Sequence, residues 1–598
     1  MKLDPNRKHT ALLAPVFALR RASDEGIGDT QAMREAVDFC VKMGFSVLQT
    51  LPIHEVVGDY SPYNPISSCA LSPALLTLSP EEVPGFPDRE TMEKAAPASW
   101  LSQLRQGAVK YNSVQSLKIH LLLASHRRFL AQAQAGGLHD EFAKFKKENA
   151  EWLDAYTLFR LLIREYEGNT NWTEWQPVHQ NRASAEAWFA HVPQHNALEQ
   201  VRDGFAFIQW VAARQWASVR SYAEARDVLL MGEMSFGVSR ASVDTWERPE
   251  LFDLDWSMGA QSLGAFDASK DSERWGQNWG FPPYRWENHR SEGFAWLRRR
   301  IRRESLTFHL CRVDHLRGYF RAYMMPWGGG PQHTDFSRLD LEQIKQRTGG
   351  RIPRFVPGPD SDPMMAKLND LQGREVISVL KEAAGSMALV AELMADMTPY
   401  MRQALEDLAV PSLSLPTLDR NPDHTLLPIA SFRPLSLATY ATHDHAPLAV
   451  QYANLVLGAQ AAHHASAVEL ESFLHLVGWK GTRPDEMNDA LLEASQRTLL
   501  GSPCVLAAFL TSDMLGIRQR YNLPGSYGAG TWAERLECSL EECLRHATYG
   551  PRLKKLKEVI AKSGRIRPSL PVAVPAPAPQ AEPGAEAAQA NIEPAHAK

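Results

Sequence analysis

Short apolar segments rich in strand-forming residues recur along the chain, and most precede a segment with helical periodicity. Their apolar residues run continuously instead of alternating, which is typical of parallel strands covered on both faces. Eight such segments together predict a closed (β/α)8 barrel, a TIM barrel, over residues 1–562. The segments are residues 11–19, 45–53, 228–236, 308–316, 387–393, 411–416, 437–444 and 504–513.

The spacing of these segments is uneven, which predicts insertions in the βα loops. Residues 80–220 show apolar positions at a period near 3.6, so we expect an inserted, mainly helical subdomain there. Residues 325–375 are rich in Gly and Pro and predict a loop insertion near the active site, because a barrel builds its site from such loops. Residues 563–598 are rich in Pro and Ala with few large apolar side chains, which predicts a disordered tail.

Charge and cysteine usage narrow the class of protein. The net charge of −5 gives no electrostatic reason to expect nucleic acid or an anionic membrane as a partner. No apolar stretch reaches the roughly 18 residues of a membrane span, and the N-terminal apolar run is short for a signal peptide. Six cysteines without a C-x-x-C pair fit a reducing compartment, so we expect a cytoplasmic protein.

Several predicted strands carry a carboxylate at or near their C-terminal ends, namely Asp314, Glu392, Asp444 and Asp513. The C-terminal ends of barrel strands converge on one mouth, so these side chains should gather there. Arg312 shares a strand face with Asp314, because side chains alternate with period two. A single Arg–Asp pair is more typical of an ion pair, but acids at three strand ends together favour catalysis.

Clustered carboxylates can divide two roles between them. Like charges raise one another's pKa, so that one group holds a proton near neutrality. Retaining cleavage of a glycosidic bond needs one ionised nucleophile and one protonated acid. We expect Arg312 to keep Asp314 ionised, and partial desolvation to raise the pKa of Glu392 into the range of a general acid. Asp444 would then stabilise an oxocarbenium-like transition state.

The same residues resemble a known family. Residues 312–318 (R-V-D-H-L-R-G) resemble the R-x-D-H-F-R-G segment of the 4-α-glucanotransferases, or amylomaltases, of glycoside hydrolase family 77. Residues 391–392 resemble the start of the family's A-E-D-L-G segment, and residues 442–444 resemble its T-H-D. The resemblance implies that Asp314 is the nucleophile, Glu392 the acid/base and Asp444 the transition-state stabiliser.

Further segments resemble the family in the same order along the chain. They are residues 26–29 (G-I-G-D), 61–63 (S-P-Y), 242–246 (S-x-D-x-W), 276–286 (G-Q-x-W-G-x-P-x-Y-x-W) and 522–526 (N-L-P-G-S, where the family has N-x-P-G-T). In the family, the fourth of these belongs to a mobile loop over the cleft. Aromatic rings can stack on the C–H faces of sugars while polar groups bond the hydroxyls. The resemblance implies sugar contacts by Arg312, His443, Ser61, Tyr63, Asp244, Gln277, Trp279 and Tyr284.

Two departures from the family pattern leave alternatives open. After Glu392 the family's Asp-Leu-Gly is replaced by residues 393–395 (L-M-A), and after Asp444 its N-D-T is replaced by residues 445–447 (H-A-P). The first interpretation is a 4-α-glucanotransferase acting on maltooligosaccharides and linear α-1,4-glucans, with no metal or organic cofactor. The second is an α-glucan hydrolase or another transglycosylase of the α-amylase clan. The third is a catalytically weak glucan-binding relative.

Overall fold

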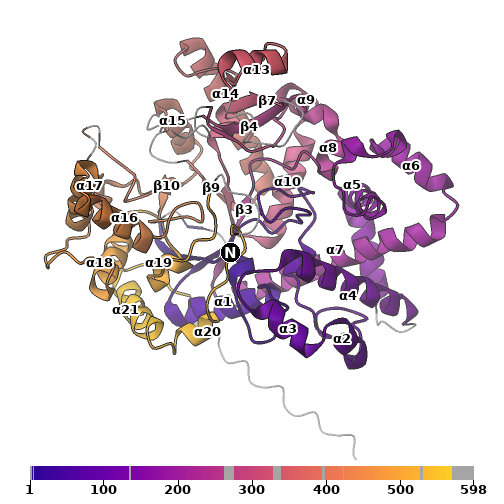
Figure 1. Ribbon diagram of the computed structural model, residues 1–598, viewed down its shortest axis with the longest axis horizontal. Helices are drawn as coiled ribbons and strands as arrows, with labels where there is room; N and C mark the ends of the chain where they lie inside the picture. The colour runs from indigo at the N-terminus through magenta and orange to yellow at the C-terminus, as the bar shows by residue number, and fades with distance from the viewer. Residues whose placement is uncertain are drawn as a thin grey trace, which may run out of the picture.

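A closed barrel of eight parallel strands forms the centre of the molecule, and helices surround it (Figure 1). The computed structural model describes residues 3–4, 6–132, 137–261, 275–327, 339–393, 397–421, 423, 425–524 and 530–568. The barrel strands are β1 (His9–Leu13), β2 (Val47–Gln49), β3 (Leu229–Met234), β6 (Leu310–Val313), β9 (Ala388–Ala391), β10 (Ser412–Ser414), β11 (Ser436–Ala438) and β12 (Leu506–Leu510). Each strand overlaps one of the eight predicted segments, which confirms the (β/α)8 barrel.

The barrel closes in the order β1-β12-β11-β10-β9-β6-β3-β2. Every neighbouring pair is parallel, and β1 bonds to both β12 and β2. All eight strands contribute side chains to one buried cluster, because inward-facing residues fill a small barrel. This cluster contains Ala11, Val47, Leu229, Met231, Leu310, Val390, Leu413, Leu437, Leu506 and Ala508.

Helices enclose the barrel on its outside. Those that follow or precede the strands are α1 (Thr30–Met43), α10 (Ala295–Thr307), α14 (Pro363–Ala384), α15 (Pro399–Asp407), α16 (Leu448–Gln460), α17 (His464–Leu476), α18 (Asp489–Leu500) and α21 (Tyr549–Lys562). Shorter helices are α8 (Val243–Glu247), α9 (Trp286–Ser291), α11 (Arg317–Phe320), α19 (Thr511–Leu515) and α20 (Leu540–Cys543).

The G-I-G-D segment has a structural explanation at the start of α1. A Cβ on Gly28 would lie 1.9 Å from the carbonyl oxygen of Val16, so only glycine permits this approach of the two backbones. Asp29 caps the helix by accepting from the backbone N–H of Ala32, and it pairs with Arg21 at 2.5 Å. The motif therefore fixes the first βα turn of the barrel.

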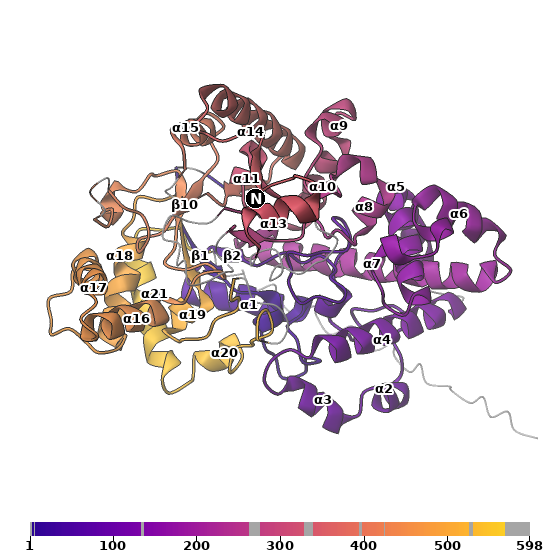
Figure 2. The same ribbon diagram turned by 45° about the horizontal axis from the view of Figure 1, so that its top comes forward.

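A group of helices between β2 and β3 extends to one side of the barrel (Figures 1 and 2). It comprises α2 (Arg89–Ala95), α3 (Ala98–Arg105), α4 (Tyr111–Ala131), α5 (Leu138–Glu165), α6 (Arg182–His191) and α7 (His195–Glu224). The long helices α4 and α5 both pack against α7, and α7 in turn packs against α1 and β3. Helix α7 thus joins the inserted helices to the barrel wall.

A small antiparallel sheet beside the barrel was not predicted. Its order is β5 (Gln277–Asn278), β4 (Trp256–Ala260), β7 (Ala322–Pro326) and β8 (Arg354–Val356). The segment 325–375, predicted as a loop insertion, therefore contains the end of β7, helix α13 (Leu341–Thr348), β8 and the start of α14. These strands are only two to five residues long, and their pairing depends on contacts between distant segments that no local pattern signals.

The folded chain extends beyond residue 562, the boundary that we predicted for the barrel. Arg565 is buried, and its guanidinium group donates to the carbonyl oxygens of His9, Leu500, Ser502 and Cys504. These bonds fasten residues 563–568 to the barrel, so the start of the predicted tail was placed too early. The remainder of that tail, from residue 569, lies outside the described residues.

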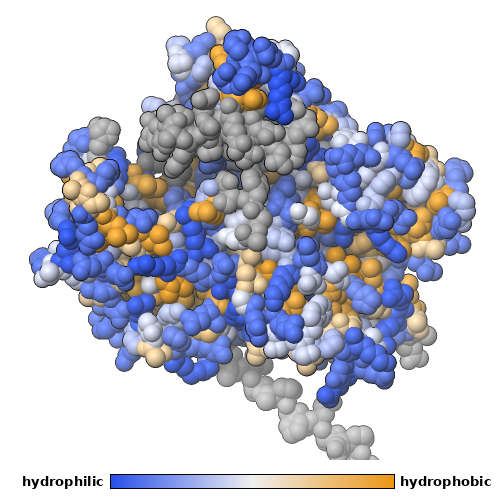
Figure 3. All heavy atoms as spheres, viewed as in Figure 1, coloured by the Kyte–Doolittle hydropathy of each residue, from blue (hydrophilic) through white to orange (hydrophobic). Residues whose placement is uncertain are grey.

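The surface of the protein is mostly hydrophilic on the face that Figure 3 shows, and apolar residues gather there in smaller groups. In the described part of the chain, no helix combines the length and the apolarity needed to cross a bilayer. All six cysteines are described, and all are free thiols.

Candidate active site

Three of the predicted acids lie at one mouth of the barrel. Asp314 follows β6 directly, Glu392 follows β9 directly, and Asp444 lies in the loop after β11. The side chains of Asp314, Glu392 and Asp444 are 17%, 19% and 34% exposed, so a ligand in the mouth can reach all three. The parallel register explains their meeting, because strands that run the same way end at the same mouth.

Arg312 connects the acids of neighbouring strands. Its guanidinium group lies 2.7 Å from Glu392 Oε1 and 3.8 Å from Asp314 Oδ1, and it forms a shorter ion pair with Glu233. Glu233 and Arg312 are register partners on β3 and β6, which points both side chains the same way. The Arg312 side chain is only 1% exposed, so these pairs form out of contact with bulk water.

Backbone groups hold the two predicted reacting carboxylates. The N–H of Phe236 donates to Asp314 Oδ2 at 2.9 Å, and the N–H of His315 donates to Glu392 Oε2 at 2.6 Å. The carboxyl groups of Asp314 and Glu392 are also close enough for each to shift the pKa of the other. Two neighbouring carboxylates repel each other, which favours a state in which one of the pair carries a proton.

The electrostatics of this pair are the reverse of our expectation. Burial and the nearby carboxylates of Glu392 and Glu233 raise the pKa of Asp314 well above its usual range. Burial also opposes ionisation of Glu392, but the cation of Arg312 and the N–H of His315 outweigh it and lower its pKa. Arg312 lies closer to Glu392 than to Asp314, so its charge favours ionisation of Glu392 over ionisation of Asp314 in the ligand-free structure.

Asp444 is held as an anion by groups from two loops. His443 Nε2 lies 2.9 Å from its Oδ2, and the amide of Asn522 donates to its Oδ1 at 2.6 Å. Arg520 donates to the Asp444 carbonyl oxygen at 2.8 Å. Burial would raise the pKa of Asp444, but His443, Arg312 and Asn522 together lower it below its usual range. This group is therefore a fixed negative charge beside the other two acids.

The loop after β2 brings Tyr63 into the same network. Its hydroxyl group donates to Glu233 Oε1 at 2.6 Å and lies 2.8 Å from His443 Nε2. The Tyr63 ring stacks on the His443 ring, with centroids 5.1 Å apart, and also contacts Trp532. Ser61 accepts from the N–H of Tyr63 at 3.3 Å, so it shapes the turn that presents this ring.

Trp279 and Gln277 belong to a segment that contacts His315, the residue that follows Asp314. The Trp279 ring meets the ring of His315 edge to face, with centroids 4.6 Å apart, and the N–H of His315 binds Glu392. The indole N–H of Trp279 donates to the side chain of Gln277, which is exposed. Trp279 therefore lies beside the residue that holds Glu392, and Gln277 bonds to the indole group of Trp279.

Two residues that we expected to contact sugar, Tyr284 and Asp244, are buried and bond to other protein groups instead. Tyr284 is buried, donates to the carbonyl oxygen of Phe236 and accepts from Arg300, so it steadies the segment whose N–H binds Asp314. Asp244 is also buried. Its two oxygens accept from the backbone and hydroxyl groups of Ser68 and from the indole of Trp296. These protein contacts occupy the polar groups that a sugar would need.

The fourth predicted strand-end acid, Asp513, does not join the cluster. It lies in α19, is buried, and accepts from the N–H of Leu448 at 2.7 Å. Glu233, the buried partner of Arg312 and Tyr63, was not among the predicted site residues. A signal existed, because a charged residue inside an otherwise apolar strand must be paired with an opposite charge.

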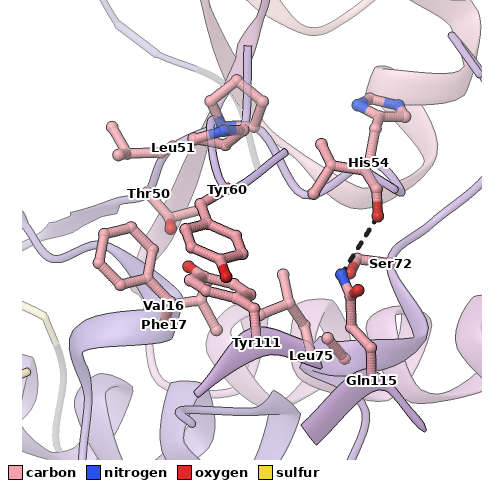
Figure 4. A pocket seen from close by; sticks show the side chains of 14 residues that line it. Val16, Phe17, Thr50, Leu51, His54, Tyr60, Ser72, Leu75, Tyr111 and Gln115 are labelled. Carbon is pink, nitrogen blue, oxygen red and sulfur yellow. Dashed lines mark hydrogen bonds between the residues drawn. The ribbon is translucent and has the colours of Figure 1, made fainter. Parts of the chain in front are cut away.

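The small pocket in Figure 4 lies beside the loop that carries Tyr63. Its volume is about 30 Å³, and its lining includes Thr50, Leu51, Tyr60 and Tyr111. The rings of Tyr60 and Tyr111 stack with centroids 4.7 Å apart. The pocket has room for water but not for a sugar ring, and none of the three acids lines it. The barrel mouth is therefore the better candidate for a glucan.

Parts of two of the resembling motifs lie outside the described residues. These are residues 394–396 after Glu392 and residues 525–526 of the segment 522–526. Among the described residues, no group of three or more His, Cys, Asp or Glu side chains has an arrangement that could hold a metal ion.

Fold and site together define a (β/α)8 barrel with a carboxylate cluster at the C-terminal ends of its strands. The family model for 4-alpha-glucanotransferases, glycoside hydrolase family 77, matches residues 14–540. The chain belongs to this family.

Individual proteins agree with the family match. The chain is 26% identical over 563 residues to the 4-alpha-glucanotransferase of Chlamydia pneumoniae, covering 92% of this chain and 95% of that protein. It is 24% identical over 518 residues to the 4-alpha-glucanotransferase of Synechocystis sp., covering 85% and 90%. The amylomaltase from Streptococcus agalactiae in complex with acarbose shares the fold, with a TM-score of 0.71 at 20% identity over 94% of this chain and all of that one.

Proposed function

We propose that the protein is a 4-α-glucanotransferase that transfers a segment of an α-1,4-glucan to the 4-hydroxyl of glucose or another glucan. One observation carries the proposal. The chain belongs to this family, and its residues Asp314, Glu392 and Asp444 lie together at one barrel mouth. The guanidinium group of Arg312 lies beside Asp314 and Glu392, and its charge also lowers the pKa of Asp444. We further propose maltooligosaccharides and linear α-1,4-glucans as substrates. The six free thiols support a cytoplasmic location.

The proposed mechanism is a retaining double displacement. Asp314 attacks the anomeric carbon while Glu392 protonates the glycosidic oxygen, which gives a glucosyl ester on Asp314 and releases the first product. Glu392 then removes the proton from the acceptor's 4-hydroxyl, which attacks the ester and frees Asp314. Both carboxyl groups approach the same guanidinium group of Arg312, and this closeness supports retention, because inverting enzymes keep their two carboxyl groups about 6.5–9.5 Å apart.

The raised pKa of Asp314 sets a requirement on substrate binding, because Asp314 must be ionised to attack the anomeric carbon. Glu392 is the neighbouring carboxyl group that can take up the proton of Asp314 when a glucan binds. The fixed anion of Asp444 then faces the positive charge that develops on the sugar ring.

Incubating the purified protein with maltotriose and resolving the products by size tests this proposal. Transfer gives glucose together with oligosaccharides longer than maltotriose. Only shorter products would mean a hydrolase, and binding without any product would mean a glucan-binding relative. Either of these two results would contradict the proposal.

A further inference from the structure

The ring of His445, next to Asp444 at the barrel mouth, is held at its Nδ1 edge by Thr442. Thr442 approaches its Nδ1 twice, with its backbone N–H at 3.4 Å and with its hydroxyl group at 2.9 Å. The Thr442 hydroxyl oxygen also accepts from the N–H of Asp444 at 3.3 Å, so its own proton is free to point to Nδ1. Nδ1 is therefore the acceptor, and the neutral ring carries its proton on Nε2.

The Nε2–H group of His445 is a donor available to a ligand. Among the residues that the structure describes, none accepts a hydrogen bond from this atom, and the side chain is only partly buried. The charged groups around the ring come from three parts of the barrel: Asp444 from its own loop, Glu392 after β9 and Arg312 on β6. Burial lowers the pKa of His445 despite the two carboxylates, so the ring is neutral near pH 7.

A glucan bound against Asp444 and Glu392 would place ring hydroxyl oxygens beside this donor. We infer that His445 contacts the substrate, donating from Nε2–H to a hydroxyl group of the glucan and so contributing to affinity and to the choice of donor or acceptor. This inference rests on the proposed function. The motif of the resembling family has Asn at this position. The side-chain oxygen of Asn can take the place of Nδ1, but no atom of Asn reaches the position of Nε2. A relative with Asn at this position would therefore lack the contact.

Two substitutions separate a substrate contact from a structural role. In His445→Asn, the side-chain oxygen can accept from Thr442 in place of Nδ1, but the donor at Nε2 is lost. In His445→Gln, the terminal amide reaches the position of Nε2 and can donate, but the acceptor for Thr442 is lost. We expect His445→Asn to weaken glucan binding about three- to tenfold, the effect of one lost hydrogen bond, and His445→Gln to stay within about twofold.

Calorimetric titration with maltoheptaose measures this difference directly. Both substitutions are made in a Glu392→Gln background, which prevents turnover during the titration, and KM for maltotriose is measured in the otherwise unchanged enzyme. Weaker binding and a raised KM in the Asn variant alone support the inference. A loss in the Gln variant alone, equal losses in both, no change in either, or no binding of maltoheptaose by the parent would overturn it. Absence of maltotriose transfer by the wild type would instead contradict the proposed function, while the titration still decides the role of His445.

Discussion

The guanidinium group of Arg312 lies 2.7 Å from Glu392 Oε1, whereas the carboxylate of Asp314, two residues further along the same chain, is 3.8 Å away. The cation therefore favours the ionised form of Glu392 more than that of Asp314. The pKa of Asp314 is raised and that of Glu392 is lowered, so Glu392 is the group that must gain a proton before it can act as the acid.

Replacing Glu392 by Gln should lower the turnover of maltotriose by about a hundred- to ten-thousandfold, because the amide cannot protonate the leaving oxygen. Gln keeps the shape of Glu and one acceptor oxygen, which can bond either Arg312 or the N–H of His315, so the fold should be kept. Initial rates together with the melting temperature test both statements. Glu148→Gln, at an exposed position, is the matched control and should behave like the wild type. Rates near those of the wild type in the Glu392 variant would exclude its role as the acid.

Replacing Tyr63 by Phe should lower kcat/KM by about ten- to a hundredfold, because it removes the hydroxyl group that bonds the buried carboxylate of Glu233 and lies beside His443. The ring and its stacking on His443 would remain. Steady-state kinetics with maltotriose measure the effect.

Tyr60→Phe provides the comparison for this change, since Tyr60 lies in the same loop and packs against Tyr111 through its ring. It should leave kcat/KM within about twofold. Equal losses in the two variants would show that the loop tolerates neither change, and the specific role of the Tyr63 hydroxyl would be refuted.

Replacing Arg312 by Met should destabilise the fold by about 3–5 kcal/mol, because Glu233 would be left as an unpaired buried charge. Neutralising that charge in a Glu233→Gln/Arg312→Met double variant should restore part of the loss. The free energy of unfolding in urea gives both numbers. Arg302→Met, at an exposed position of α10, should change it by less than about 0.5 kcal/mol. A double variant less stable than the Arg312 single variant would contradict the pairing.

The stability of the fold should depend on pH through Asp513. Burial raises the pKa of Asp513 to about 7 in the folded protein, although the N–H of Leu448 opposes the shift. In the unfolded chain this group ionises near its ordinary pKa of about 4. Between these two values the unfolded state binds fewer protons than the folded state, so the free energy of unfolding should fall as the pH rises from about 4 to 7.

Asp513→Asn should remove this contribution, because its amide oxygen can still accept from Leu448 and the group does not titrate. Urea unfolding of the wild type and the variant at pH 4.5 and 7.5 measures the difference in slope. Asp154→Asn, an exposed change in α5, should keep the slope of the wild type. A wild-type slope in the Asp513 variant would mean that this carboxyl group ionises normally in the folded protein.

Much of the architecture was predictable from local pattern. Each barrel strand shows as an apolar run because it is buried on both faces, as in β12, where all five residues are buried. The short strands of the outer sheet gave no such signal. Gln277–Asn278 consists of two polar residues and forms β5 only because β4 lies beside it.

The residues of the candidate site also fall into those that the sequence could place and those that it could not. Asp314 and Glu392 could be placed because each lies near the C-terminal end of a predicted strand, and these strand ends share one mouth. The burial of Asp244 and Tyr284 could not be foreseen, since their partners Ser68 and Phe236 lie far away in the sequence. A sugar contact and a buried hydrogen bond require the same polar residue types, so the sequence pattern cannot distinguish them.

The sequence by itself determined the barrel, the family resemblance and the three candidate acids, because the burial of the strands and the order of the motifs follow from local residue patterns. The tertiary structure alone decided that Arg312 lies closer to Glu392 than to Asp314, that Tyr284 and Asp244 are bonded within the protein, and that no described residue accepts from Nε2 of His445. Protonation and hydrogen-bond saturation depend on distances of a few ångströms between side chains from different strands. Only the folded chain sets those distances.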